Sequence, residues 1–276
     1  VSGDFIEKVD GISSEELGLA NTASKLRGES GTKVLVEISS ESGEIREIDL
    51  ERRSVDLRPV RTKRLRDDSH TIGYLRITQF SESVPKKVEE ALQELKEKEV
   101  EGLILDLRNN SGGLVSSGIA VADSLLSEKP IVETKNRNGI KDAITSQKET
   151  SYDGPMVTLV NKGTASASEI LAGSLQDNGR STLLGEQTYG KGLIQSLKSL
   201  GENSGVAITV ASYLTPKGNN IQGQGITPDK LLDLPDASDY GSAEDKWVRN
   251  AELFLDSFLE KEEVSIQTPE ISNEEI

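Results

Sequence analysis

A serine and a glutamate stand three residues apart at the start of an apolar run. The stretch "NKGTASASEI", residues 161–170, places Ser166 and Glu169 just before Ile170, which is the spacing of a helix capping box. A serine on a tight strand-to-helix turn also exposes its hydroxyl, and the N–H groups of a helix start can stabilise an oxyanion. These residues alone do not decide whether Ser166 is a helix cap, a nucleophile or both.

The second candidate for chemistry is the lysine in "TYGKGLIQ". Lys191 is flanked by glycines, and Gln195 follows four residues later. A lysine in a turn is ordinarily a solvated surface residue. If it is buried, its charged form is disfavoured by up to ~3 to 5 pKa units, and the neutral amine can accept the proton of a serine hydroxyl. A Ser/Lys pair can thus catalyse acyl transfer without histidine or cysteine.

Composition removes several other kinds of site. The chain has no cysteine, which excludes thiol nucleophiles, zinc-thiolate sites and disulfides. Its one histidine, His70, lies in the polar stretch "RDDSHTIG", where we expect a solvated linker residue, and a single histidine makes a poor metal site. The net charge of -15 argues against a nucleic-acid partner. We therefore expect no metal and no cofactor.

The glycine-rich turns "NNSGGL" and "GQGITPD" do not match phosphate-binding motifs, since both lack the G-x-G-x-x-G and G-K-[ST] patterns. The first of them follows an apolar strand. A Gly-Gly pair there lets the backbone approach a substrate closely, because no Cβ obstructs it. This turn is therefore a candidate source of N–H donors.

The elements that must position these residues divide into two modules. Residues 13–28 have the pattern of a helix, and residues 32–38 and 45–51 that of two strands in a hairpin. A stretch with seven Lys or Arg between Arg52 and Arg66 follows, and we interpret it as a solvated linker. After it, apolar strands alternate with helices, which predicts a layered α/β domain with a partly parallel sheet. Ligand chemistry in such sheets tends to lie at the carboxyl ends of strands.

The end of the chain has a different pattern. Residues 242–261 predict an amphipathic helix with Trp247, Ala251, Phe254, Leu255 and Phe258 on one face, docked on the protein body. The last residues, 262–276, are polar and acidic and are expected to be disordered. No run of 18 apolar residues could span a bilayer. The chain does not begin with Met, and we interpret it as part of a longer precursor.

Three motifs in order carry a family resemblance. "LILDLRNNSGG", "GTASASEI" and "TYGKGLIQ", with Lys191 25 positions after Ser166 (191 minus 166), resemble the C-terminal processing, or tail-specific, serine proteases. The resemblance covers roughly residues 1–235. It is greatest to the cyanobacterial and chloroplast branch, whose task is to trim the C-terminal extension of the photosystem II D1 precursor. It implies a layered α/β serine peptidase core of the ClpP/crotonase-like type, with a partial α+β PDZ domain at the N-terminus.

The resemblance also assigns roles to individual residues. It implies that Ser166 is the nucleophile, Lys191 the general base, and Gln195 a residue that orients the lysine. The oxyanion hole would consist of the backbone N–H groups of Gly112 and Ala167. Ser168 competes with Ser166, but the family pattern selects the first serine. Asp177 matches an acidic position that supports the site in some members, and Ser111 departs from the proline common before the Gly pair.

The expected domains follow from the same resemblance. Residues 1–53 would be the C-terminal part of a truncated PDZ domain, 54–70 a linker, 71–235 the Ser/Lys peptidase core, 236–261 the C-terminal helix and 262–276 the tail. The carboxylate-binding loop of a PDZ domain is absent, so we expect residues 1–53 to bind substrate tails poorly.

Two kinds of function remain open at this stage. The resemblance implies a protein substrate with an unstructured C-terminal tail, which can belong to a membrane protein although this chain has no integral membrane segment. It also implies an extracytoplasmic location, in the periplasm or thylakoid lumen. The alternatives are a non-catalytic binding protein on the same fold and a PDZ scaffold. Lys191 with Gln195 is the feature that pure binding would not require.

Overall fold

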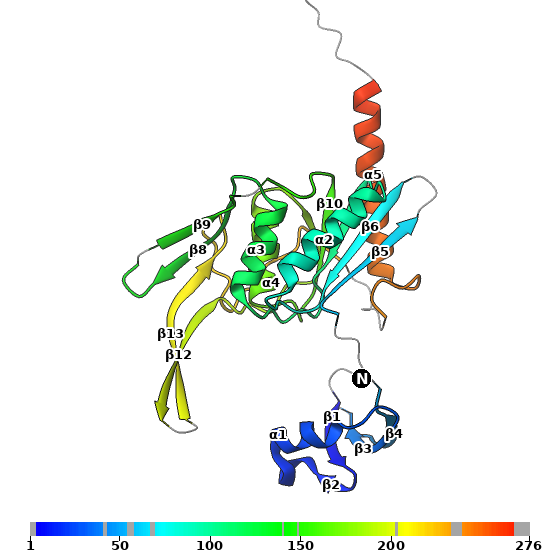
Figure 1. Cartoon of the computed structure of the whole chain (residues 1–276), viewed down its shortest axis with the longest axis vertical. Coiled ribbons are helices and arrows are strands. Elements are labelled where there is room, and N and C mark those ends of the chain that lie inside the picture. The colour runs from blue at the N-terminus through cyan, green and yellow to red at the C-terminus, as the bar shows by residue number, and fades with distance from the viewer. Residues whose placement is uncertain are drawn as a thin grey trace, which may run out of the picture. The chain divides into compact units, whose positions relative to one another are not determined.

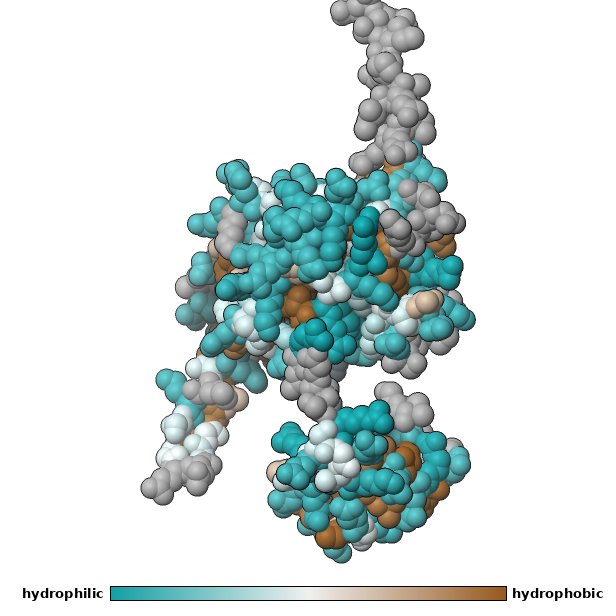
Figure 2. Space-filling model, turned by 45° about the vertical axis from the view of Figure 1, so that its right-hand side comes forward, coloured by the Kyte–Doolittle hydropathy of each residue, from teal (hydrophilic) through white to brown (hydrophobic). Residues whose placement is uncertain are grey.

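The computed structural model describes residues 4–40, 43–53, 58–66, 70–139, 141–147, 149–201, 204–232 and 239–267. The chain forms two compact units, Val1–Leu57 and Arg58–Ile276. No helix in these described ranges is long and apolar enough to cross a membrane. The visible face of the larger unit is mostly hydrophilic (Figure 2), as expected for a chain with many charged residues.

The smaller unit is an antiparallel sheet with one helix (Figure 1). Val9, Val34 and Val36 form its buried core, and a core of this size gives modest stability. The predicted helix and hairpin are both present. The elements are β1 (Phe5–Val9), β2 (Ile12–Ser13), α1 (Ser14–Leu26), β3 (Lys33–Ser39) and β4 (Ile45–Glu51), with strand order β2-β1-β3-β4.

The larger unit is built on a six-stranded sheet of order β14-β11-β10-β7-β6-β5. Its neighbours pair in parallel except for β5 and β6, which are antiparallel. The strands are β5 (Val60–Arg66), β6 (Thr71–Ile77), β7 (Gly102–Asp106), β10 (Met156–Val160), β11 (Thr182–Gly185) and β14 (Lys230–Leu231). The partly parallel sheet predicted from the alternating pattern is thus confirmed.

Helices cover both faces of this sheet (Figure 1). One face packs against α2 (Val84–Glu97), α3 (Val115–Leu125) and α4 (Ala167–Asp177), and the other against α5 (Lys246–Gln267). Successive strand residues alternate between the two layers, so that Leu103 and Leu105 contact the first group and Ile104 the second. Burial on both faces explains why these strands read as continuous apolar runs.

A second sheet, of order β12-β13-β8-β9, is antiparallel throughout. Its strands are β8 (Pro130–Asn136), β9 (Lys141–Thr145), β12 (Leu193–Gly201) and β13 (Ser204–Leu214). The hairpin of β12 and β13 projects from the body of the larger unit (Figure 1). β12 begins two residues after Lys191, so this sheet fixes where the lysine loop ends.

Two expectations from the sequence need correction. The stretch expected as a linker contains β5, an edge strand whose many Arg and Lys side chains conceal its strand pattern and protect the sheet edge. His70 is not a solvated linker residue, because it is only 7% exposed and its Nδ1 lies 3.0 Å from Oδ1 of Asp256 on α5.

The C-terminal helix also differs from its predicted bounds. α5 begins at Lys246 and continues to Gln267, into the expected tail. Residues 233–238 lie outside the described residues. Residues 268–276, on which the rest of the tail prediction falls, also lie outside them. The predicted docking of this helix is confirmed for Trp247, Ala251 and Leu255, which are buried against the sheet. Of the other two residues predicted on this face, Phe254 is partly buried and Phe258 is 46% exposed.

Truncating the docked face of α5 should destabilise the larger unit. Leu255 is 1% exposed, and its change to Ala should lower the free energy of unfolding by about 2–5 kcal/mol through lost burial and a residual cavity. Leu253, which is 61% exposed on the same helix, is the control, and Leu253→Ala should change it by less than about 0.5 kcal/mol. Urea unfolding measures both, and equal effects would contradict the docked orientation.

Candidate active site

The Ser166 turn connects β10 to α4. Ser166 is the N-cap residue of α4, with φ 58° and ψ -118°, in a region that side-chain-bearing residues rarely adopt. Such a conformation costs of order 1–3 kcal/mol and persists only where the surroundings fix it. A strained serine on a strand-to-helix turn is also the arrangement that exposes the nucleophile in α/β-hydrolases. Here the Ser166 side chain is half-buried.

Glu169 fixes this turn and links it to the lysine loop. Its buried carboxylate accepts the N–H of Ser166 at 2.8 Å and that of Lys191 at 2.9 Å through Oε2. Through Oε1 it accepts the N–H of Gly190 and the hydroxyl of Thr188, both at 2.6 Å. A buried carboxylate needs such donors to offset its desolvation. One side chain thus holds both backbone segments, and the glutamate half of the predicted capping box is present.

Lys191 and Gln195 line one open cleft with a volume of about 520 Å³. Both side chains are exposed, and a bulge between Ile194 and Gln195 changes the direction of β12 beside the cleft. The two segments are joined through Glu169 and by the N–H of Tyr189, which donates to the carbonyl of Thr164 at 3.0 Å. Among the described residues, no hydrogen bond joins the Ser166 hydroxyl to the Lys191 amine. The remaining lining residues are Ser111, Gly163, Ala165, Tyr189, Gly190, Leu193 and Gln222.

The two predicted oxyanion donors lie side by side. A Cβ on Gly112 would meet the carbonyl oxygen of Ala165 and Cβ of Ser166 at 2.8 Å and the nitrogen of Ala167 at 3.1 Å, and its φ is 98°. Only glycine fits there. Ala167 is the first residue of α4, where N–H groups lack an intrahelical acceptor. The N–H of Gly112, in contrast, donates to Oδ1 of Asn110 at 3.0 Å.

The structure distinguishes the two candidate serines. Ser168 is fully buried, and its hydroxyl donates to the carbonyl of Asn110 at 2.9 Å. The N–H of Ala165 donates to the same carbonyl at 3.0 Å. Ser168 therefore attaches the Ser166 turn to the turn that carries Gly112, and Ser166 is the more accessible of the two serines.

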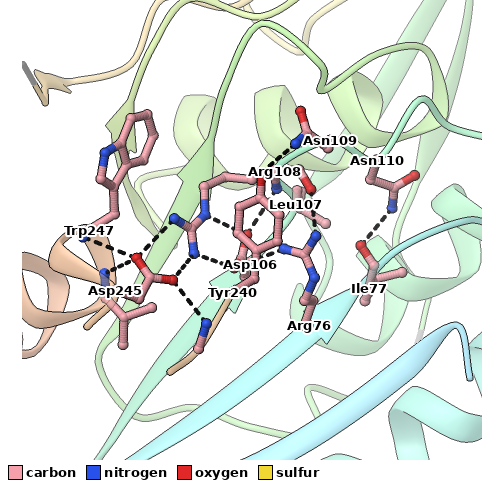
Figure 3. Close-up of polar contacts among 12 residues, drawn as sticks. Arg76, Ile77, Asp106, Leu107, Arg108, Asn109, Asn110, Tyr240, Asp245 and Trp247 are labelled. Carbon is pink, nitrogen blue, oxygen red and sulfur yellow. Dashed lines mark hydrogen bonds and ion pairs between the residues drawn. The ribbon is translucent and has the colours of Figure 1, made fainter. Parts of the chain in front are cut away.

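A buried charge cluster surrounds Asp106 and Arg108 at the end of β7 (Figure 3). Asp106 and Arg108 are fully buried, and Asp106 accepts from Nε and Nη2 of Arg108 at 3.0 and 2.7 Å. Asp106 also accepts the hydroxyl of Tyr74 at 2.6 Å and forms an ion pair of 3.0 Å with Arg76. Asp245 contacts the other side of Arg108, with Oδ2 2.6 Å from Nη2.

The pKa shifts in this cluster follow from its burial and pairing. Burial alone would lower the pKa of Arg108, but its bonds to Asp106 and Asp245 outweigh burial and raise it. Burial would raise the pKa of Asp245, yet the bonds from Arg108 and from backbone N–H groups hold it below its ordinary value of 3.8. Burial, followed by the Asp106 charge, raises the pKa of Tyr74. Arg108 and Asp245 therefore stay charged as a pair.

Asp177 is not close to the other site residues. It ends α4, whose 11 residues separate it from the Ser166 turn by about 16 Å. Its carboxylate accepts the N–H of Lys217 at 2.8 Å. Any support it gives the site is therefore indirect, through the loop after β13.

Sequence reasoning missed Asp106, Arg108 and Asp245, and it assigned Glu169 only a capping role. The first two had a usable signal, because a D-x-R pair ending an apolar strand places two charges on one buried face. Asp245 had none, since its partner lies 137 positions away.

The family follows from the fold, this site and a direct sequence match. The sequence model of peptidase family S41 matches residues 71–232. The chain belongs to this family.

The most informative relatives are processing proteases. A carboxyl-terminal-processing protease of Synechocystis sp. (strain ATCC 27184 / PCC 6803 / Kazusa) is 47% identical over 236 residues, which cover 84% of this chain and 55% of the relative. Carboxyl-terminal-processing peptidase 2, chloroplastic, of Arabidopsis thaliana is 40% identical over 238 residues, covering 83% and 46%. The chain thus spans about half the length of the curated relatives it matches.

Solved structures agree with the family assignment. A photosystem II D1 C-terminal processing protease matches with a TM-score of 0.68 and 37% identity, over 84% of this chain and 63% of that one. A lipoprotein from Streptococcus agalactiae matches with a TM-score of 0.55 and 22% identity, over 73% and 71%, and shows the fold alone.

Replacing Glu169 should disable the site although Ser166 and Lys191 themselves are not replaced. Glu169→Gln exchanges one acceptor oxygen for an NH₂ group, so buried donors lose their partner at a cost of about 1–3 kcal/mol each. We expect kcat for peptide hydrolysis to fall at least about tenfold, because the turn loses its anchor. Glu186→Gln, which removes a surface ion pair with Lys162, is the control and should leave kcat unchanged. Full activity in Glu169→Gln would contradict the role of this carboxylate.

The buried Asp245 should make stability depend on pH on the acid side. Because its pKa is lowered on folding, its stabilisation is complete above the ordinary value of 3.8 and is lost as the pH falls through the folded-state pKa. The difference in unfolding free energy between wild type and Asp245→Asn should therefore be constant near neutral pH and shrink in strong acid. Urea titrations across this range measure it, and a difference independent of pH would refute the assignment.

Proposed function

We propose that the protein is a serine endopeptidase that cleaves near the C-terminus of protein substrates through a Ser/Lys dyad. The observation that carries the proposal is the Glu169 carboxylate, which accepts the N–H groups of both Ser166 and Lys191. Binding alone does not require a strained serine and a lysine loop to share one buried anchor. The names of the relatives, which are processing proteases, support the same reaction.

The proposed reaction proceeds through an acyl-enzyme. Neutral Lys191 accepts the hydroxyl proton of Ser166 as Oγ attacks the scissile carbonyl carbon, and the oxyanion accepts hydrogen bonds from the N–H groups of Ala167 and Gly112. The C–N bond then breaks, and Lys191 returns the proton to the leaving amine. Lys191 then accepts a proton from a water molecule that attacks the ester carbonyl, and it passes this proton to Oγ of Ser166 as the ester C–O bond breaks and the acid is released. Gln195 orients the lysine amine in both steps.

Substrate binding completes this arrangement. Lys191 is exposed in the free cleft, and a bound tail that covers the cleft would remove it from water and disfavour its charged form. Catalytic hydrogen bonds are often formed only in the substrate complex. The Gly112 N–H must likewise exchange its Asn110 acceptor for the developing oxyanion.

The substrate and location rest on the relatives. We propose that the substrate has an unstructured C-terminal tail and includes the photosystem II D1 precursor, as the name of the similar solved protease states for that protein. The chloroplast relatives favour the thylakoid lumen or the periplasm. Residues 1–53, within the smaller unit, would be the C-terminal part of a PDZ domain, and Asp177 would support the site through the loop at Lys217.

The full-length protein and a peptide with a D1-type C-terminal extension test the reaction. We expect Ser166→Ala and Lys191→Ala to lower kcat at least ~10³-fold, because each removes a reacting group. Ser168→Ala is the matched comparison, because it removes a buried hydroxyl that supports the turn but no reacting group, and it should lower kcat far less than either change. Mass spectrometry locates the cut.

The alternatives predict a different result. If the protein is a non-catalytic binder or a PDZ scaffold, the peptide stays intact in wild type and binds equally well to Ser166→Ala. Cleavage retained in Lys191→Ala would reject the dyad and leave the serine without its assigned base.

A further inference from the structure

We propose that Asp245, in the segment before α5, is a positioning residue for peptide hydrolysis, because it holds Arg108 and thereby the turn that carries Gly112 beside Ser166. The inference rests on the proposed function. It adds a part of the chain that lies outside residues 71–232, the region that the family model matches.

The contact between Asp245 and Arg108 is bidentate and buried. Oδ1 of Asp245 lies 3.1 Å from Nη1 of Arg108, and Oδ2 lies 2.6 Å from Nη2. Arg108 has no exposed surface, and Asp245 is 1% exposed. Asp106 binds the remaining edge of the guanidinium through Nε and Nη2 (Figure 3). Bidentate pairing on two sides fixes both the position and the plane of the arginine.

The charges in this cluster are balanced only when Asp245 is ionised. Asp106 and Asp245 supply two negative charges, and Arg76 and Arg108 two positive charges. All four side chains are buried. Removing one partner of such a cluster leaves an uncompensated charge in a dry interior, which is strongly unfavourable. The surrounding backbone then moves to admit water or a new partner.

A second residue of the same segment contacts the turn. The hydroxyl of Tyr240 accepts a hydrogen bond from Nδ2 of Asn109. Its ring lies against the guanidinium of Arg76 at 4.0 Å and that of Arg108 at 4.6 Å. Cation–π contacts of this kind add to the pairing where the cation is desolvated. Asp245 and Tyr240 therefore hold the beginning of the turn through the side chains of Arg108 and Asn109.

The turn has little freedom between Arg108 and the site. The carbonyl of Arg108 accepts from Nη2 of Arg76, and Asn110 donates from Nδ2 to the carbonyl of Ile77 at 2.9 Å. Gly112 then lies against Ser166 so closely that a Cβ would not fit. A displacement at Arg108 is therefore transmitted to the oxyanion donors, and a misplacement of about 1 Å can cost roughly 100-fold in rate.

Asp245 has a second role that the test must separate. Its Oδ1 accepts the N–H groups of Trp247 and Val248 at 3.2 and 3.3 Å, so it also caps α5. Asparagine is an equally good N-cap residue. Asp245→Asn therefore keeps the start of the helix and removes the charge that holds Arg108.

The test measures steady-state hydrolysis by full-length wild type, Ser166→Ala and Asp245→Asn. We expect kcat of Asp245→Asn to fall at least about tenfold with KM within roughly twofold, since the substrate contacts are unchanged and the transition state is less well stabilised. The affinity for a peptide boronic acid, which forms a tetrahedral adduct, should fall in parallel. Binding of the uncleaved peptide in a Ser166→Ala background should not change.

Two further variants keep the result interpretable. Asp256→Asn alters a buried carboxylate that lies on α5 itself. This carboxylate pairs with His70 rather than with Arg108, so the change should leave kcat within about twofold. Tyr240→Phe keeps the ring and removes the acceptor for Asn109. It should fold normally and lower kcat by a few fold at unchanged KM.

The possible outcomes separate the inference from the proposed function. If wild type leaves the peptide intact, the proposed function fails and the inference falls with it. If wild type cleaves and Asp245→Asn equals it in kcat, or if Asp256→Asn loses as much as Asp245→Asn, the inference alone is overturned. A loss of kcat confined to Asp245→Asn and Tyr240→Phe supports it.

Discussion

The site depends on one buried carboxylate with four hydrogen-bond donors. Glu169 accepts from the Ser166 turn and from the loop of Lys191, two segments more than 20 residues apart in sequence (191 minus 166 is 25). A buried carboxylate is tolerated only when its oxygens accept hydrogen bonds. The carboxylate therefore depends on these donors, and the donors depend on the carboxylate as their acceptor. That mutual requirement explains how a serine is kept at positive φ on an otherwise regular strand-turn-helix connection.

A second set of buried polar contacts holds the turn that carries Gly112. The Gly112 turn is held on one side by Asn110 and Ser168 and on the other by the Asp106, Arg108 and Asp245 cluster. The cleft above, by contrast, is open, with Lys191 and Gln195 exposed. Fixed backbone donors beside exposed side chains suit a site that the substrate completes. A shared fold does not by itself define the chemistry, which depends on these particular side chains.

Local patterns in the sequence predicted much of this structure. Periodicity predicted the alternation of apolar strands and helices in the larger unit, to which α2, α3, β7 and β10 belong, because burial imposes a regular pattern on each of them. β5 was not predicted, because the charged side chains that protect this sheet edge conceal its strand pattern. The burial of His70 was not predicted either, because its partner Asp256 lies far along the chain. Asp245 was missed for the same reason. The position of Ser166 could be predicted locally, but the charge cluster and the exposure of Lys191 depend on three-dimensional packing.

The central claim is that Ser166 forms a covalent acyl-enzyme with the help of Lys191. Rapid quenching of the full-length protein with a C-terminal peptide substrate, followed by mass spectrometry, tests it most directly. The account predicts an ester adduct that maps to Ser166 in wild type and is absent from Lys191→Ala. An adduct on Ser168, or turnover that proceeds while Ser166 is replaced by Ala, would contradict it.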